Sequence, residues 1–217
     1  MFYMVNNRCG ENTVVSGKII GRLSLYRRLL HGLVLEGTES VYSHELAALA
    51  RVTAAQVRRD IMNIGASGNP NRGYDVKKLI AGIAVFLDAP EVQNVALIGV
   101  GNLGRAILAF FAGRRPKLSI VAAFDNDPEK SGRVIHGCPC YSFDQLEEIV
   151  KTYNIRIATL CVPAAEAQKV AIKLVDAGFK GILNFAPVPL HVPRSIYVED
   201  IDMTMSLEKV AYFARII

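Results

Sequence analysis

The chain has 217 residues, of which 51% are hydrophobic and 21% charged, and its net charge is +5. That length permits one large or two small domains, and the composition excludes an intrinsically disordered chain. Its apolar runs are shorter than the roughly 18 residues that a membrane-spanning helix needs, so we expect no membrane partner.

Residues 1–17 lack the basic start and apolar core of a secretory signal, and we expect a flexible leader there. Four cysteines without a disulfide-framework spacing favour free thiols in a reducing compartment, which predicts a cytoplasmic protein. Residues 1–90 hold 11 Lys and Arg against 7 Asp and Glu, whereas residues 91–217 hold 14 against 13. The basic excess permits a phosphate-rich partner for the N-terminal part, although a solvated basic surface explains it equally well.

Residues 18–88 show the element order of a winged helix-turn-helix domain. An apolar stripe at intervals of four and three predicts a helix over residues 18–36, and Ser43 is a plausible N-cap for a second helix. Thr53 and Gln56 fit a capping box, in which Gln56 reaches back to the cap, and they open a third helix that ends near residue 64. The Gly- and Asn-rich residues 65–74 predict a hairpin or exposed loop. A fourth helix, 75–87, ends at a Pro-containing break that we take as a domain boundary.

Residues 92–202 alternate between strand and helix patterns. Expected strands span residues 95–100, 119–125, 157–161, 181–185 and 195–199, and expected helices span 103–114, 143–151 and 164–177. This alternation predicts an α/β domain with a doubly wound parallel sheet. The last segment, 203–217, is expected to hold a short helix from about residue 206 that is too apolar to lie free.

The strongest local motif is a strand that runs into Gly-x-Gly-x-x-Gly, at Gly99, Gly101 and Gly104, and then into a helix. Gly99 permits the sharp turn, Gly101 lets the backbone approach a pyrophosphate, and Gly104 lets the helix pack close to the strand. Asp125 ends the next strand, where a carboxylate binds the adenosine ribose and repels a 2'-phosphate. The motif therefore predicts a Rossmann site for NAD(H). Coenzyme A is disfavoured, because Asp125 suits a ribose diol better than a 3'-phosphate.

Catalytic groups are not evident. Tyr74 and Lys78 have the spacing of a catalytic pair but precede the dinucleotide strand, and His191 is as well explained by a surface position. His136, Cys138 and Cys140 are metal-ligand types, but they lack a second pair to close a tetrahedral site, and a turn with a short strand is the simpler interpretation. We predict no catalytic residue and no metal. An NAD-dependent oxidoreductase with an N-terminal dimerisation domain remains the alternative.

The third predicted helix carries two basic residues, Arg58 and Arg59, where a recognition helix presents side chains to DNA. A solvated basic helix face is the alternative. Arg72 and Tyr74 in the hairpin favour DNA, because an Arg there can enter a narrow minor groove.

Taken together, these motifs resemble the Rex family of redox-sensing transcriptional repressors over about residues 18–217. The matching segments are Ala55-Gln-Val-Arg-Arg-Asp60, Gly73-Tyr74-x-Val76, Gly99 to Gly104, Phe124-Asp125-x-Asp127-Pro-Glu-Lys130 and Gly181-Ile-Leu-Asn-Phe-Ala-Pro187. The resemblance implies a homodimer with a swapped C-terminal helix, which binds operator DNA near fermentation and respiration genes when NAD is abundant. NADH would close the dimer and release the DNA.

The resemblance also implies the site residues. The adenosine half of NAD(H) would contact Gly99, Val100, Gly101, Asn102, Leu103, Gly104 and Asp125, and the nicotinamide half Cys161, Val162, Pro163, Asn184, Phe185, Ala186 and Pro187. DNA would face Gln56, Arg58, Arg59, Arg72 and Tyr74. Arg27 and Asp202 are implied switch partners, and Phe110 stands where the family commonly has a Tyr whose hydroxyl could help report redox state.

Overall fold

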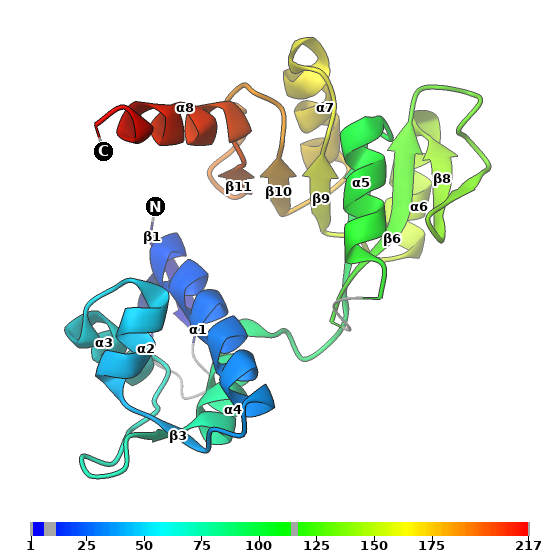
Figure 1. Cartoon of the computed structure of the whole chain (residues 1–217). Helices are drawn as coiled ribbons and strands as arrows, with labels where there is room; N and C mark the ends of the chain where they lie inside the picture. The colour runs from blue at the N-terminus through cyan, green and yellow to red at the C-terminus, as the bar shows by residue number, and fades with distance from the viewer. Residues whose placement is uncertain (1, 7–11, 114–116, 217) are drawn as a thin grey trace. The chain divides into compact units, whose positions relative to one another are not determined.

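The computed structural model describes residues 2–6, 12–113 and 117–216 and divides into two compact units, Met1–Ala89 and Pro90–Ile217 (Figure 1). The last residue of the predicted helix 103–114 and the last residue of the predicted segment 203–217 lie outside the described residues. Each unit has its own hydrophobic core, so each is described by itself.

The first unit is helical, with two small antiparallel sheets. Strands β1 (Phe2–Asn6) and β2 (Asn12–Ser16) pair with each other where the sequence suggested a flexible leader. Both segments contain β-branched residues, which favour strands. The remaining elements are α1 (Gly17–Leu35), β3 (Ser40–Val41), α2 (Ser43–Ala50), α3 (Ala54–Asn63), β4 (Tyr74–Asp75) and α4 (Val76–Leu87).

The core of this unit forms because apolar residues recur at helical spacing and face one another. Leu23, Tyr26 and Leu30 of α1 are fully buried, as the predicted stripe requires. They share one cluster with Val57 and Ile61 of α3 and with residues of α2 and α4. This cluster holds α3 against α1 and leaves the opposite side of α3 in solvent.

The starts of α2 and α3 differ from expectation in one respect each. Ser43 is the first residue of α2 rather than its cap. The N-cap is Tyr42, and its backbone N–H donates to the Glu45 carboxylate at 2.7 Å. Thr53 caps α3 as predicted, since its Oγ1 accepts the backbone N–H of Gln56 at 3.2 Å. The Gln56 side chain does not complete the capping box, because it donates to the buried Asp60 carboxylate at 2.8 Å instead.

The predicted hairpin is present between α3 and α4. Asn69 and Gly73 form an antiparallel bridge at its tip, and β4 pairs with β3 at its base. The Tyr42 hydroxyl donates to the Asn71 carbonyl at 2.8 Å and ties the loop to the start of α2. The unit therefore has the helix, helix, helix and wing order of a winged helix-turn-helix.

The second unit is built on one seven-stranded sheet with the order β11-β10-β9-β5-β6-β8-β7. All neighbouring strands are parallel except β7 and β8, which form an edge hairpin that the sequence did not predict as two strands. The strands are β5 (Gln93–Ile98), β6 (Leu118–Asp125), β7 (Val134–Ile135), β8 (Cys138–Ser142), β9 (Ile157–Leu160), β10 (Gly181–Asn184) and β11 (Tyr197–Asp200).

The predicted doubly wound arrangement is confirmed, because helices pack on both faces of this sheet. Leu97 of β5 packs with α5 (Asn102–Phe111), whereas its neighbours Ala96 and Ile98 face a larger cluster. That cluster includes α6 (Leu146–Thr152), which follows the short 3-10 turn η1 (Phe143–Gln145), and α7 (Ala164–Asp176). The strand order reverses between β5 and β9, which is where ligands bind in open α/β sheets.

The chain ends in α8 (Met203–Ala214), which starts earlier than the expected residue 206 because Asp202 caps it. None of its residues is buried, although it is rich in apolar side chains. The exposed ones are Met203, Met205, Leu207, Val210, Tyr212 and Phe213. In the described part of the chain, no helix is both long and apolar enough to cross a membrane.

Candidate functional site

The turn between β5 and α5 can be built only with glycine at two positions. Gly99 has φ +92°, and a Cβ there would lie 2.6 Å from the carbonyl oxygen of Cys161. A Cβ on Gly104 would lie 2.1 Å from the carbonyl oxygen of Gly99, so the helix can approach the turn only without a side chain. Gly101, at the N-cap of α5, has no atom within 4 Å of its Cβ position. The backbone at Gly101 is therefore open to a ligand, beside the amides of the helix N-terminus.

Asp125, at the end of β6, holds this turn in place. Its Oδ2 accepts the backbone N–H of Val100 at 2.7 Å and the Lys130 ammonium at 3.2 Å, while Oδ1 accepts the N–H of Asp127 at 2.9 Å. Burial of the carboxyl group opposes ionisation, but these hydrogen bonds outweigh it and lower the pKa of Asp125. The carboxylate is thus ionised at neutral pH and already part of the turn.

Lys130 lies between two carboxylates. Its ammonium is 3.2 Å from Asp125 and 3.4 Å from Asp127, so this group of three side chains carries a net charge of −1. Burial lowers the pKa of Lys130, but the hydrogen bond and charge of Asp125 raise it further, so the ammonium remains protonated. A negative net charge beside a ribose site disfavours a 2'-phosphate.

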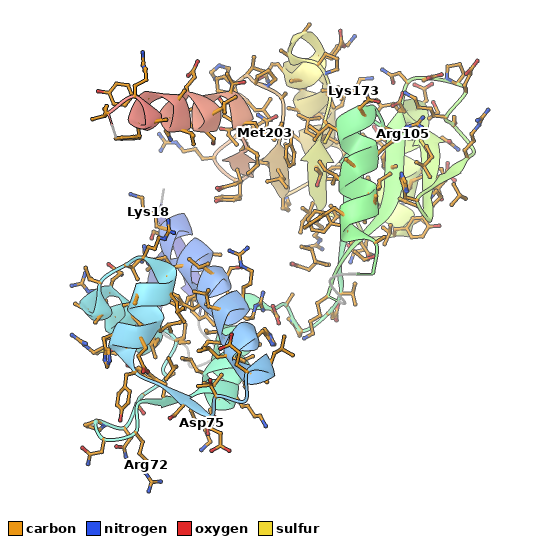
Figure 2. The ribbon with its side chains drawn as sticks, in the orientation of Figure 1. Lys18, Arg72, Asp75, Arg105, Lys173 and Met203 are labelled. Atoms are coloured by element: carbon orange, nitrogen blue, oxygen red, sulfur yellow. The ribbon has the colours of Figure 1, made fainter. Side chains whose placement is uncertain are left out.

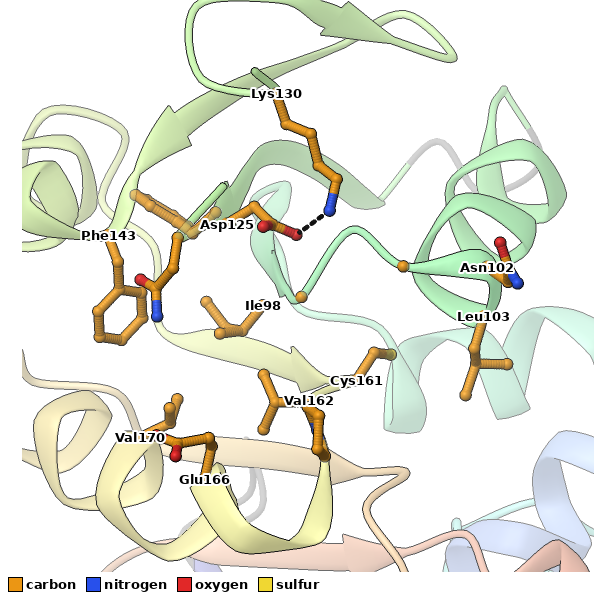
Figure 3. A pocket seen from close by; sticks show the side chains of 15 residues that line it. Ile98, Asn102, Leu103, Asp125, Lys130, Phe143, Cys161, Val162, Glu166 and Val170 are labelled. Atoms are coloured by element: carbon orange, nitrogen blue, oxygen red, sulfur yellow. Dashed lines mark hydrogen bonds and ion pairs between the residues drawn. The ribbon is translucent and has the colours of Figure 1, made fainter. Parts of the chain in front are cut away.

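A pocket of about 490 Å³ opens beside this turn, between the carboxyl ends of β5, β6 and β9 (Figure 3). Figure 3 shows Ile98, Val162, Phe143 and Val170 around the space and the Asp125–Lys130 ion pair at its edge. The other lining residues are Gly99, Gly101, Asn102, Leu103, Phe124, Asn126, Cys161, Pro163 and Glu166. Apolar walls with a carboxylate and open backbone amides fit an adenosine group followed by a pyrophosphate.

The structure brings most of the predicted cofactor residues together at this pocket. Val100 and Gly104 do not line the pocket. The Val100 N–H donates to Asp125, and Gly104 packs against Gly99. The segment Asn184–Pro187, predicted for the nicotinamide half, does not line the pocket. Asn184 is fully buried and donates to Val188 O and Asp200 Oδ1, which indicates a role in holding the turn after β10.

Sequence reasoning missed several lining residues. Ile98 and Phe124 carried only the pattern of buried strand residues, and Phe143, Glu166 and Val170 come from later parts of the chain with no motif of their own. Lys130 had a detectable signal, because it closes the acidic segment that begins at Asp125.

The thiols of the second unit are held in their protonated form. Burial raises the pKa of Cys161 to about 12, and burial with the nearby Cys140 raises that of Cys138 to about 12. A protonated thiol is a poor nucleophile. His136 and Gly137 form the β7–β8 turn, and among the described residues no cluster of ligand side chains could hold a metal ion.

The first unit presents basic side chains on α3 and on the wing. Arg58 and Arg59 are exposed, and Arg58 donates to the Ser43 hydroxyl at 3.1 Å across the turn between α2 and α3. Arg72 is exposed at the tip of the wing, and Figure 2 shows its side chain pointing away from the loop. The two remaining predicted DNA residues are half-buried: Gln56 bonds Asp60, and the Tyr74 ring lies against Gly68.

The predicted switch residues have local partners in the described structure. The Arg27 guanidinium donates to Asp88 Oδ1 at 2.6 Å, within the first unit. Asp202 caps α8 by accepting the backbone N–H of Met205 at 2.7 Å. Phe110 is 56% exposed on α5.

Comparison with known proteins decides the family. The redox-sensing transcriptional repressor Rex of Lactobacillus gasseri is 42% identical over 192 residues, which is 88% of this chain and 90% of the relative. Rex of Anoxybacillus flavithermus is 43% identical over 194 residues, 89% of this chain and 91% of the relative. The chain belongs to the Rex family.

Solved Rex structures share the fold of this Rex-family chain. The Rex-family repressor RSP in complex with NAD+ and operator DNA is 33% identical, with a TM-score of 0.86 and coverage of 94% of both chains. RSP in complex with NADH has a TM-score of 0.83 at 32% identity, covering 94% of this chain and 95% of that one. Two family models also match: "CoA binding domain" over residues 91–188 and "Putative DNA-binding protein N-terminus" over residues 14–61.

Proposed function

We propose that this chain is a redox-sensing transcriptional repressor that binds operator DNA through α3 and the wing and releases it when NADH binds the Rossmann unit. The observation that carries the proposal is the match, over nearly the full chain, to a Rex repressor solved both with NADH and with NAD+ plus operator DNA. Members of this family are repressors rather than enzymes, so the oxidoreductase alternative is set aside. The cytoplasm, where bacterial DNA lies, is the proposed location.

The cofactor is NAD(H), bound with its ribose at Asp125 and its pyrophosphate at Gly101 and the start of α5. Asp125 is ionised, and Gly101 is open to solvent, as such a ligand requires. The nicotinamide half would extend past Cys161 and Pro163 towards the turn after β10. Coenzyme A remains disfavoured despite the name of the matching family model, because the negative group around Asp125 repels a phosphate on the ribose.

The two redox forms differ in charge at the nicotinamide ring, and that difference supplies the signal. NAD+ carries a cationic ring and NADH a neutral one, and apolar surroundings such as the half-buried Cys161 favour the neutral ring. A ligand shifts an equilibrium only by its difference in affinity for the two states. Moving the population from mostly bound to mostly released needs about 5.5 kcal/mol over all the sites of the assembly.

The assembly is a homodimer in which α8 packs against the partner subunit. Exposed apolar side chains along a whole helix, such as Leu207 at 69% and Phe213 at 60%, are unfavourable in water and typical of a protein interface. The exchange of a terminal helix between two copies would cover them. Two copies of α3 would then reach two half-sites of a pseudo-palindromic operator.

The switch would act on Arg27 and Asp202. Arg27 is held by Asp88 at 2.6 Å, so a new partner must compete with an existing ion pair. Asp202→Asn should abolish the NADH response while leaving DNA binding, and Asp88→Asn should strengthen the response by freeing Arg27. An unchanged NADH response in both variants would remove these residues from the switch.

The decisive experiment is fluorescence anisotropy of the full chain on a pseudo-palindromic, AT-rich duplex at fixed salt, titrated separately with NADH and NAD+. Release by NADH at concentrations where NAD+ has no effect supports the proposal. Tight binding that is unchanged by both ligands would overturn the redox function. In that case Phe110→Tyr tests whether the missing hydroxyl is the cause. A chain that binds no DNA on any duplex would overturn the repressor function itself.

A further inference from the structure

One buried carboxylate gathers four hydrogen bonds at the centre of the first unit. Asp60 of α3 is 0% exposed. Its Oδ2 accepts Arg22 Nε at 2.6 Å and the Tyr26 hydroxyl at 3.0 Å, both from α1. Its Oδ1 accepts Arg22 Nη2 and Gln56 Nε2, each at 2.8 Å. The carboxylate thus joins α1 to the first turn of α3.

These partners keep Asp60 ionised although it lies in the core. Burial alone would raise the pKa of Asp60, but the bidentate hydrogen bond from Arg22 and the donors of Gln56 and Tyr26 lower it below the ordinary value. Burial and the neighbouring carboxylate raise the pKa of Tyr26, so its hydroxyl keeps the proton that it donates. The centre of the cluster is therefore an acceptor and cannot donate.

An acceptor at this position fixes which way the Gln56 amide points. An amide side chain can normally rotate to exchange its oxygen and nitrogen, but an ionised carboxylate can only accept hydrogen bonds, so it pairs with the amide NH2 group and not with the amide oxygen. Gln56 must therefore turn its NH2 group towards Asp60, as the 2.8 Å contact shows. Its second N–H and its carbonyl oxygen have no partner among the described residues, and the side chain is half-buried rather than enclosed.

Those two remaining groups match one base. Adenine offers an acceptor, N7, and a donor, the N6 amino group, in the major groove, and a Gln amide pairs with both at once. Gln56 is the third residue of α3, and the N-terminal residues of a recognition helix are the ones that contact base edges. A reversed amide would present the wrong order of donor and acceptor to that edge.

We propose that Asp60 is a positioning residue for operator recognition, because its carboxylate locks the Gln56 amide in the one orientation that reads adenine. The inference rests on the proposed DNA-binding function. It adds that a residue which never touches DNA sets the base preference at one position of each half-site.

The test begins with the full-length wild-type chain and a random duplex library, from which the preferred operator is selected. Each A·T pair of the half-site is then replaced by G·C, and affinities are measured by anisotropy across a range of salt. Wild type should prefer adenine at one pair by about tenfold, and Gln56→Ala should lose the preference at that pair alone. Asp60→Asn should lose it at the same pair, and adding Gln56→Ala to Asp60→Asn should remove nothing more.

The salt dependence separates positioning from a general structural role. Asp60→Asn should keep the slope of affinity against salt, because the phosphate contacts are unchanged. Tyr26→Phe is the matched control, since it removes one donor from the same carboxylate and leaves the Gln56 contact intact; its base preference should equal that of wild type. Equal weakening on all duplexes, or a full adenine preference in Asp60→Asn, would overturn the inference. Absence of DNA binding by wild type would instead overturn the proposed function.

Asp60→Asn leaves the Arg22 guanidinium without its counter-ion, which can unfold the unit. If its thermal melt shows this, the Arg22→Gln and Asp60→Asn double variant removes both charges and takes its place in the assay. Independently of any variant, NMR of the wild-type Gln56 side-chain amide should show one proton shifted by a strong hydrogen bond to a carboxylate. Two ordinary amide protons would contradict the locked orientation.

Discussion

Replacement of Gly104 by Ala should destabilise the Rossmann unit through one identifiable contact. The new Cβ would lie 2.1 Å from the carbonyl oxygen of Gly99, and a backbone atom cannot rotate out of the way. Relief requires α5 to move by about 1 Å from β5, which loosens the packing of the buried Ile107 and Leu108. Overpacking of this kind costs about 3 kcal/mol at the upper end, and the better helix propensity of Ala returns about 1 kcal/mol. The net loss of about 2 kcal/mol corresponds to a fall in Tm of roughly 6 °C for a unit of this size.

Gly101→Ala is the matched control, because a Cβ there meets no atom within 4 Å. Its backbone φ of −79° is ordinary for Ala, so the loss should stay below about 1 kcal/mol, the usual difference between helix caps. The added methyl group would instead stand where the pyrophosphate approaches. NADH at 100 times its Kd should stabilise wild type by about 2.7 kcal/mol, and Gly101→Ala should lose about half of this if its Kd rises tenfold.

The assay is a thermal melt of the full chain with and without NADH, following the transition that the ligand shifts. Gly104→Ala should melt early without ligand, whereas Gly101→Ala should melt near wild type and respond weakly to NADH. A wild-type melting temperature for Gly104→Ala, or an undiminished NADH shift for Gly101→Ala, would refute the assignment of these two glycines.

Four further outcomes are expected. Asp125→Asn should raise the affinity for NADPH relative to NADH by about tenfold, because the group of Asp125, Asp127 and Lys130 would then be neutral and would no longer repel the 2'-phosphate. The double variant with Lys130→Met should lose this gain in a fluorescence titration. The folded-state pKa of Asp125 lies below its ordinary value of 3.8, so its ionised carboxylate stabilises the folded state above about pH 4. This stabilisation should disappear as the pH falls through the lowered pKa. Acid unfolding curves should show the loss for wild type and not for Asp125→Asn. Phe213→Asp should convert a dimer to a monomer in analytical ultracentrifugation without lowering the far-UV helix signal, as the side chain is 60% exposed in the single chain. Alkylation of Cys161 by iodoacetamide should stay slow at pH 8, and rapid labelling would contradict its pKa of about 12.

The fold could be predicted from the spacing of apolar residues and the positions of glycines, because both signals come from residues that are close together in the sequence. The stripe through Leu23 and Tyr26 and the turn at Gly99 are set by residues a few positions apart. At the β7–β8 hairpin the sequence predicted a turn with one short strand, and β7 was missed because two residues are too short to show an alternating pattern.

The site residues that belong to a sequence motif could be predicted. Those brought to the pocket from distant segments could not. Asp125 follows from its spacing to Gly99, whereas Phe143 and Glu166 reach the pocket only because β8 and β9 end at the same edge of the sheet. Gln56 shows a different limit. Its local pattern predicted a capping box, but Asp60, whose burial depends on the packing of α1 on α3, took the amide instead.

The hydrogen bond from Val100 to Asp125 also bears on how fast the protein can respond. The glycine-rich turn is held at 2.7 Å by groups of the chain itself, so its order does not depend on contacts from a ligand. Association with a preformed site proceeds at the rate of productive collision, and the lifetime of the complex then depends on dissociation. The response time to a change in the NADH supply should accordingly follow the rate at which the bound dinucleotide leaves.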